Sequence, residues 1–413
     1  MNSLGVSVYL TALLLLAAVF FKSKVGKGSS ITVLFWLLLM MVTPGFVMDV
    51  QELFFWGSVG IENLTLFLFL LLFTAIPWIF FENWYKSIST IEVSENGVRI
   101  LSTVFLIVII SCIFSYIYIA PYAIKSYSLG AAATRGLVNS DESVLPSSIL
   151  TTFAVGVSSI SPFYIFFFFL SLLHPALKKY SFGLFISSFI YIWVSMPFMA
   201  RDGFVTLPVF FVIFYLIFRK SLARTDIKKV KRYFSVIAGV AGSLLLIYSL
   251  SRFYNKRNGD SAFMSLIDGT WGYLYQQPYV FDRTLTYQQS WHGLGLRFPL
   301  FAKIIGQDIK PFERTQDFET MFGTMLSEFY SIGGYWYLIG FTIAFVLIYY
   351  VGLRMLINRR NYFSVFLFFI TYLIIEVTGL FYFRYGGTTF NWLFLILTIL
   401  PFFLTNKILI LKR

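Results

Sequence analysis

Long hydrophobic runs constrain this chain more than any other feature. Leu64–Phe81 and Phe363–Phe383 are two examples, and a water-soluble fold would have to bury both of them entirely. Hydrophobic residues make up 58% of the chain and charged residues 12%. Soluble domains carry about twice that charged fraction. The chain is therefore predicted to be an integral membrane protein.

A membrane-spanning helix needs about 20 apolar residues, and this rule predicts about eleven spans. They cover residues 4–21, 30–48, 62–81, 101–121, 149–173, 181–199, 203–218, 233–251, 331–353, 362–383 and 388–405. No basic residue precedes the first apolar run, so we interpret it as a retained span rather than a cleaved signal peptide. The expected fold class is an all-α polytopic membrane protein.

The basic residues predict the orientation of these spans. Most of the 32 Lys and Arg lie in the loops after the first, third, fifth, seventh, ninth and eleventh spans. The positive-inside rule assigns such loops to the cytoplasm, so the N-terminus is expected outside and the C-terminus inside. Residues 219–232 form the densest basic run. We interpret this run as a topology anchor that touches anionic lipid, with docking of a partner as the alternative.

One polar segment is too long and too charged to be a turn between spans. It covers residues 252–330, and it divides the chain into spans over 1–251, a large extracytoplasmic loop and further spans over 331–413. The spacing of its apolar residues predicts a short helix that Gly306 would end. Those residues are Phe298, Leu300, Phe301, Ile304 and Ile305. A second helix is predicted over 316–330, so we expect a partly helical cap over the outer mouth of the spans.

Composition narrows the possible chemistry. A net charge of +13 would suggest nucleic acid in a soluble protein, but here anionic lipid and the positive-inside bias account for it. The single cysteine, Cys112, excludes a disulfide framework, and two histidines make a zinc site improbable. The sequence has no Walker loop and no Asp-x-Asp pair. We therefore expect no metal, no cofactor and no nucleic-acid partner.

Four arginines are candidates for binding phosphate on the outer side. Arg201 and Arg384 occupy two very short outer hairpins, and Arg283 and Arg314 lie in the large loop. The guanidinium group is always charged and can bond phosphate through two parallel hydrogen bonds. The alternative is an interfacial anchor or an ion pair, which for Arg201 would form most directly with Asp202.

The large loop also supplies aromatic rings and a histidine. Tyr275, Tyr279 and Trp291 could stack against sugar rings, although an interfacial aromatic belt uses the same residue types. Histidine is the side chain that ordinarily titrates near neutral pH. His292 is therefore a candidate general base, with a hydrogen-bonded structural role as its alternative.

Glu376 is a carboxyl group inside a predicted span. It lies eight residues before Arg384, about 12 Å deeper along a helix. A charged group at that depth costs roughly 2.5–3.5 kcal/mol, so it should face the interior of the bundle. Both a buried hydrogen bond and a role toward substrate are consistent with this position.

The order of several short motifs is more specific than any one of them. Ala200-Arg201-Asp202-Gly203 begins a span that precedes the basic run, and 272–283 reads GYLYQQPYVFDR. Residues 318–323 read FETMFG, and 328–334 read EFYSIGG just before a span. Over about residues 195–390, this order resembles the Wzy-type oligosaccharide repeat-unit (O-antigen) polymerases.

The resemblance implies a metal-independent, inverting glycosyltransferase in the bacterial inner membrane. Its donor and acceptor would be oligosaccharides linked to undecaprenyl pyrophosphate, and a chain-length co-polymerase would be a partner. Arg201 and Arg283 match arginines of the family. The family's usual Asp-Phe-Gly before the span that follows the loop is replaced here by Glu328-Phe329-Tyr330. Glu328 is the second candidate base, after His292. The alternatives are an O-antigen ligase, which uses the same donor, and a lipid-linked oligosaccharide flippase or transporter without chemistry.

Overall fold

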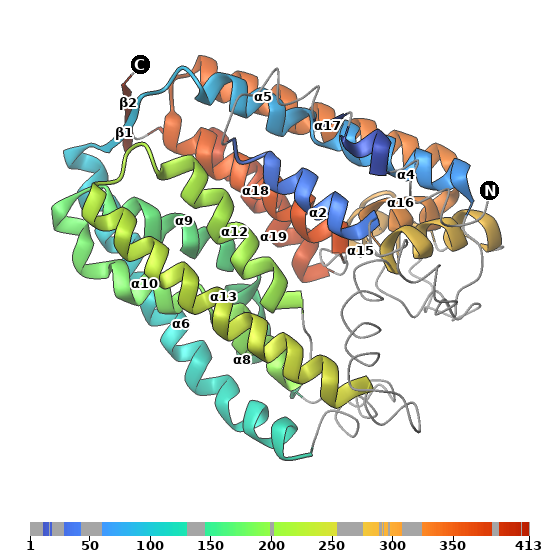
Figure 1. The fold of residues 1–413 in the computed structure, drawn as a ribbon, viewed down its shortest axis with the longest axis horizontal. Coiled ribbons are helices and arrows are strands. Elements are labelled where there is room, and N and C mark those ends of the chain that lie inside the picture. The colour runs from blue at the N-terminus through green and yellow to red at the C-terminus, as the bar shows by residue number, and fades with distance from the viewer. Residues whose placement is uncertain are drawn as a thin grey trace. The chain divides into compact units, whose positions relative to one another are not determined.

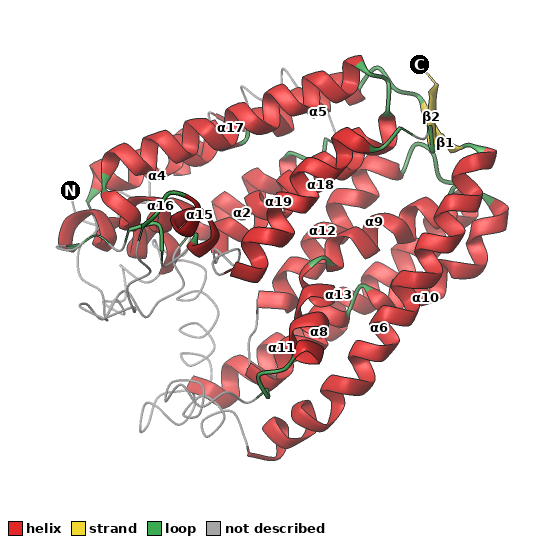
Figure 2. Ribbon diagram, turned by 180° about the vertical axis from the view of Figure 1, so that it is seen from behind, coloured by secondary structure: helices red, strands yellow, loops and turns green. Residues whose placement is uncertain are grey.

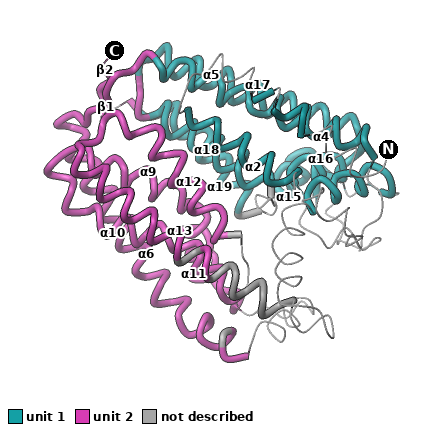
Figure 3. The backbone as a smooth tube through the Cα atoms, viewed as in Figure 1, with its two compact units in different colours: residues 1–86, 271–360, 364–404 teal, residues 87–270, 361–363, 405–413 magenta. Residues whose placement is uncertain are grey.

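The computed structural model of the chain is built almost entirely from helices, as Figure 2 shows. It describes residues 11–15, 17–18, 29–42, 60–129, 145–198, 202–253, 276–288, 291, 293–295, 298–307, 324–381, 388–405 and 407–412. Within these ranges the chain forms two compact units, coloured separately in Figure 3. Unit 1 comprises residues 1–86, 271–360 and 364–404, and unit 2 comprises residues 87–270, 361–363 and 405–413.

Unit 1 is a helical bundle around one central helix. Its elements are α2 (Thr32–Val42), α4 (Ile61–Thr74), α5 (Ile76–Tyr85), a helix over residues 276–287, α15 (Pro299–Ile304), α16 (Met325–Gly333), α17 (Tyr335–Asn358), α18 (Tyr362–Phe381) and α19 (Thr388–Phe403). The apolar stretch of α18 is buried along its whole length. Its rings pack against three neighbours: Phe81 of α5, Tyr349 of α17 and Phe402 of α19. α5 and α17 run side by side (Figure 1), joined by the Phe80–Tyr350 ring contact.

Unit 2 is organised around α9 (Ser161–Leu172), in which every residue is buried. Its other elements are β1 (Thr90–Val93), α6 (Glu95–Leu129), α8 (Ile149–Ser159), η1 (Pro175–Tyr180), α10 (Ser181–Ser187), α11 (Ile190–Ser195), η2 (Met196–Phe198), α12 (Asp202–Phe218), α13 (Arg224–Phe253) and β2 (Leu409–Lys412). Phe168 and Phe169 of α9 both contact Phe211 of α12. Phenylalanine side chains therefore form much of this core.

A two-stranded antiparallel sheet ties the C-terminal segment to the start of α6. Thr90 pairs with Lys412, and Val93 pairs with Leu409. The Ile91 amide donates to Ser221 Oγ at 2.8 Å, which joins the loop after α12 to the sheet. Three loops predicted on the same side of the membrane therefore meet within unit 2.

Several helices have the length and composition of membrane spans. Among the described residues, five helices are long and apolar enough: 61–85, 95–126, 175–198, 335–358 and 362–380. A sixth arises if α8 and α9, bent by 53°, form one span. The chain is thus an all-α, multi-pass membrane protein in its described part, but the full set of eleven predicted spans is not shown.

The differences from the predicted spans have local causes. The span predicted at 149–173 bends because Pro162, at the start of α9, cannot continue the hydrogen bonding of α8. The helices at 32–42, 203–218 and 390–403 are apolar but shorter than a full span. The span predicted at 4–21 lies largely outside the described residues.

The two predicted loop helices can be compared directly with the structure. The short helix before Gly306 is confirmed: it is α15, and Gly306 has a φ of +72°, a conformation that ends helices. The second predicted helix can be compared only from residue 324 onward, where α16 covers Met325–Gly333; 316–323 lie outside the described residues. Gly334, with φ +81°, separates α16 from α17.

Candidate functional site

The helix over residues 276–287 carries the predicted site residue Arg283 and belongs to unit 1. Phe281 is fully buried, and its ring lies 5.0 Å from the ring of Phe67 on α4. This apolar contact packs part of the large loop against a predicted membrane span.

Asp282 fixes this helix to the beginning of α4. Its Oδ1 accepts hydrogen bonds from the Gly60 amide at 3.0 Å and from Asn63 Nδ2 at 2.9 Å. Asp282 is buried, and Gly60 is the residue that precedes α4. A carboxylate is favoured at this place because the N-terminus of a helix carries partial positive charge and unsatisfied amides.

Arg283 is held between two tyrosine rings of its own helix. Its Cζ lies 5.0 Å from the ring centre of Tyr279 and 4.9 Å from that of Tyr287. These residues are four positions before and after Arg283, so a helix places all three on one face. Both distances are within the range of cation–π attraction. The arrangement fixes the position of a permanent positive charge that is half-buried.

The two tyrosines beside Arg283 differ in exposure. Tyr279 is 6% exposed, whereas Tyr287 is 47% exposed. Burial raises the pKa of Tyr279, and the neighbouring Arg283 partly opposes that shift. Tyr279 therefore keeps its phenolic proton at neutral pH. Its predicted role was sugar stacking, and in the structure its ring lies beside the guanidinium group of Arg283.

The helix over 276–287 is also joined to α16, the helix of Glu328. Tyr330 donates a hydrogen bond from its hydroxyl to the Leu285 carbonyl at 3.3 Å. Ser331 Oγ donates to Gln288 Oε1 at 2.9 Å. Burial, with a smaller contribution from Tyr335, raises the pKa of Tyr330, which stays protonated and able to donate. These contacts place the elements that carry Arg283 and Glu328 side by side in unit 1.

Glu328 lies in the first turn of α16 and is buried. Thr324 begins this helix, with its hydroxyl oxygen accepting from the Ser327 amide at 3.3 Å. An acidic residue in the first turn is favourable because of the helix dipole. The structure therefore provides a local structural reason for Glu328, and its predicted role as a base stays a prediction.

Trp291 is the exposed ring of the predicted sugar-binding set. It is 51% exposed and packs edge-on against Tyr330, with 5.3 Å between the ring centres. The backbone of Gly334 also lies close to this indole, since a Cβ built at Gly334 would be 3.1 Å from the ring. The Gly293 amide donates to the Ile332 carbonyl at 3.1 Å, which ties the segment after Trp291 to α16.

The remaining predicted site residues lie outside the described residues. They are Arg201, Tyr275, His292, Arg314 and Arg384. Their roles as phosphate ligands, sugar contact and general base stay predictions. The structure therefore brings together four members of the predicted set in one region of unit 1: Tyr279, Arg283, Trp291 and Glu328.

Glu376 occupies the buried interior that its place in a span predicts. It is 0% exposed, and its Oε1 lies 2.8 Å from Thr74 Oγ1. Tyr372 donates from its hydroxyl to the Thr74 carbonyl at 2.7 Å, so α18 meets the end of α4 through two polar contacts. The hydrogen-bonding alternative for Glu376 is thus observed.

Sequence reasoning did not single out Asp282 or its partners Gly60 and Asn63. Asp282 and Gly60 are separated by 222 positions, and no local pattern connects them. The available signal was indirect, namely an acidic residue next to Arg283 and a glycine just before a predicted span. Neither feature identifies the other without the fold.

Comparisons with known proteins do not assign the chain to a family. Searches against protein-family models, curated proteins and solved structures each found no match. In the part of the chain that the structure describes, no group of three or more His, Cys, Asp or Glu side chains could hold a metal ion. The described site offers a positioned arginine, an exposed tryptophan ring and a buried carboxyl group.

Proposed function

We propose that the protein polymerises oligosaccharide repeat units linked to undecaprenyl pyrophosphate. The reaction takes place at the periplasmic face of the bacterial inner membrane, in a chain with about eleven spans, its N-terminus in the periplasm and its C-terminus in the cytoplasm. It is an inverting glycosyl transfer that needs no metal. The product is an O-antigen or a similar surface polysaccharide.

The observation that carries the proposal is the restraint of Arg283. Its guanidinium group lies between two tyrosine rings, on a helix that Asp282 anchors to α4. A fixed arginine at a membrane-facing loop suits a phosphate ligand, because its charge is permanent and its planar group can bond two phosphate oxygens. The order of sequence motifs around it supports the same activity.

In the proposed reaction, a hydroxyl group of the acceptor repeat unit attacks the anomeric carbon of the donor glycan. The bond from that carbon to the pyrophosphate oxygen breaks, and the leaving group departs as undecaprenyl pyrophosphate. Arg201, Arg283, Arg314 and Arg384 stabilise the charge that develops on it. His292, or in its place Glu328, takes the proton of the acceptor hydroxyl. Tyr275 and Trp291 guide the glycan, while Tyr279, whose ring is 6% exposed, keeps Arg283 in position.

Two alternatives remain distinguishable by experiment. An O-antigen ligase would use the same donor but transfer it to a lipid A core, so its loss would remove all surface O-antigen. A flippase or transporter would move the lipid-linked oligosaccharide without chemistry. Such proteins usually have internal repeats and polar sites at mid-membrane depth; Glu376 is the feature of this chain that favours that alternative.

Substitution of Arg283 tests the proposal. We expect Arg283→Ala to leave lipid A with at most one repeat unit, because the leaving group loses its fixed positive charge. Arg283→Lys should retain a short or weak ladder of chain lengths, since lysine keeps the charge but lacks the planar fork. Lys303→Ala, which removes an exposed cation from α15, is the matched control and should give a normal ladder.

The readout must separate lost activity from lost protein. Membrane levels and melting temperatures of the variants should match those of the wild type before their gels are compared. A full ladder from Arg283→Ala at normal protein level would contradict the role of Arg283.

A further inference from the structure

The first turns of α13 present a basic face on unit 2. Arg224, Lys228, Lys231 and Arg232 are all exposed. At about 100° per residue they fall on one side of the helix. Asp226, Val230 and Ile237 fall on the other side and are buried. α13 is therefore amphipathic here, with its charged side turned away from the core of unit 2.

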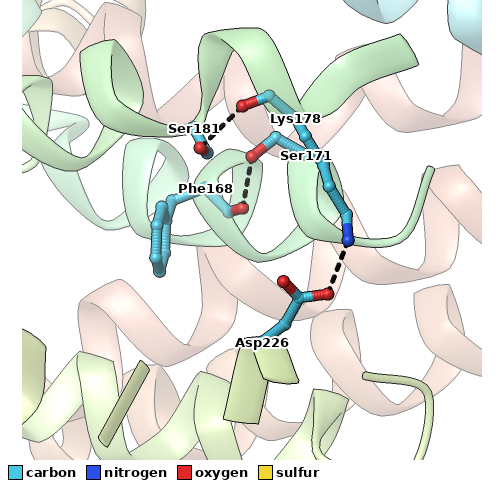
Figure 4. Close-up of polar contacts among 5 residues, drawn as sticks. All are labelled: Phe168, Ser171, Lys178, Ser181 and Asp226. Carbon is cyan, nitrogen blue, oxygen red and sulfur yellow. Dashed lines mark hydrogen bonds and ion pairs between the residues drawn. The ribbon is translucent and has the colours of Figure 1, made fainter. Parts of the chain in front are cut away.

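An ion pair joins a second basic segment to the buried side of these α13 turns. Lys178 Nζ lies 2.7 Å from Asp226 Oδ2, as Figure 4 shows, and Ser181 Oγ donates to the Lys178 carbonyl at 2.7 Å. The rings of Phe185 and Tyr233 stack at 4.6 Å and hold α10 against α13. Lys178 and Lys179 of η1 are thus neighbours of the α13 turns in space, although they are about fifty residues apart in sequence.

We call this combined region the basic surface. It consists of exposed residues from η1, from the loop after α12 and from α13: Lys178, Lys179, Lys220, Arg224, Lys228, Lys229, Lys231 and Arg232. Asp226 is the only acidic residue in 174–182 and 219–233, and it is already paired with Lys178. The basic surface therefore carries a large excess of positive charge that lacks matching acids within these two segments.

Exposed apolar residues lie directly next to the charges. Val236, one turn beyond Arg232, is 57% exposed. Phe182 and Ile186 of α10 are 65% and 42% exposed and follow Lys179 on one helix face. A soluble polyanion has no apolar groups to contact these side chains. A phospholipid has a phosphate group that can bind the basic residues and acyl chains that can contact the apolar residues beside them.

We propose that the basic surface is a binding site for anionic phospholipids, with headgroup phosphates on the lysines and arginines and acyl chains against Phe182, Ile186 and Val236. This site consists of residues of unit 2, whereas Arg283 belongs to unit 1, and it does not depend on the polymerase proposal. The Lys178–Asp226 ion pair holds η1 next to α13 and so keeps the basic residues of these two elements close together.

The test measures which lipids the purified full-length protein retains. The protein is mixed with phosphatidylglycerol and phosphatidylcholine at equal mole fraction, and bound lipids are counted by native mass spectrometry. The variant is Lys228→Gln/Lys231→Gln. Lys228→Arg/Lys231→Arg keeps the charge, and Lys125→Gln/Lys303→Gln removes two exposed lysines elsewhere.

The wild type should retain phosphatidylglycerol in preference to phosphatidylcholine, and the preference should fall with rising salt. The glutamine variant should lose a measurable part of this preference, by about fivefold for each lysine, while both control variants keep it. The salt dependence is measured on the wild-type protein alone, so this part of the test remains valid even if the glutamine variant folds poorly.

Three results would overturn the proposal. The wild type could show no preference at low salt, or the glutamine variant could keep the full wild-type preference. The third result has two parts. In phosphatidylcholine nanodiscs the wild type binds polyaspartate and the glutamine variant does not, and the wild type shows no preference for phosphatidylglycerol. That combination would assign the basic surface to a soluble acidic partner.

Discussion

Asp282 fixes the helix of Arg283 to the beginning of α4. Its carboxylate accepts from the Gly60 amide and from Asn63 Nδ2, and it is 3% exposed. Asp282→Ala should lower the free energy of unfolding by about 1–3 kcal/mol, because it removes a buried carboxylate that accepts two hydrogen bonds from the beginning of α4. Asp282→Asn should cost less, since the amide oxygen can still accept. Thermal unfolding of the purified protein measures both.

Thr286→Ala serves as the control for that measurement. Thr286 is on the same helix, is exposed and accepts only from Asn63 Nδ2 at 3.2 Å. Its removal should change stability by less than about 0.5 kcal/mol. If Asp282→Ala were as stable as Thr286→Ala, the carboxylate would not be anchoring the helix.

At the scale of single residues, the sequence predicted which side chains could take part in chemistry better than it predicted which residues they contact in the fold. Arg283 was predicted as a phosphate ligand from its residue type and surroundings, but the two tyrosines that hold it were not predicted as its partners. Tyr279 was expected to face sugar, and its ring is only 6% exposed. Such contacts depend on the helix over 276–287, for which the sequence offered no clear periodic pattern.

Gly334 marks an element boundary at which substitution should be costly. It separates α16 from α17 with φ +81° and ψ −157°, a backbone region that only glycine adopts without strain. An added Cβ would also lie 3.1 Å from the Trp291 ring. Gly334→Ala should therefore destabilise the protein by about 1–3 kcal/mol, as measured by its melting temperature.

Gly340→Ala is the matched control on α17. Gly340 lies inside the helix, and nothing lies within 4 Å of a Cβ built there. Alanine favours a helix over glycine by about 1 kcal/mol, so this variant should be as stable as the wild type or more so. Equal melting temperatures for the two variants would show that the Gly334 conformation is unimportant.

At the scale of elements, hydropathy predicted where helices occur but not where they break. The span predicted at 181–199 consists of α10, α11 and η2, separated near Ser188 and Pro197. Ser188 donates from Oγ to the Phe185 carbonyl at 2.6 Å, a bond that competes with regular helix hydrogen bonding. The prediction of α15 was correct because its apolar spacing and the glycine that follows it, Gly306, indicated the same short helix.

The orientation of the whole molecule can be tested through its single cysteine. Cys112 is buried, so Cys112→Ser provides a background for new labels. Lys303→Cys should react with a membrane-impermeant maleimide in spheroplasts, because the large loop is proposed to be periplasmic. Lys229→Cys should react only after permeabilisation. The reverse pattern would contradict the proposed orientation and with it the site of the reaction.

At the scale of the whole molecule, composition was sufficient to predict a multi-pass helical membrane protein. Composition could not predict the division into two units, because each unit joins segments far apart in the chain, such as residues 1–86 with 271–360. It also could not reveal that η1 meets α13 through Lys178 and Asp226. The division into units and the contact of η1 with α13 both depend on packing between segments far apart in the chain. Local sequence patterns carry no information about such packing.

The most direct test of the proposed function is a gel of surface polysaccharide from a bacterial strain that lacks this gene, with and without the gene restored. Polymerase action predicts that the ladder of chain lengths disappears, that a band with a single repeat unit remains, and that restoring the gene brings the ladder back. An unchanged ladder would contradict the account. Loss of every band would contradict it as well, and would indicate a ligase or a flippase instead.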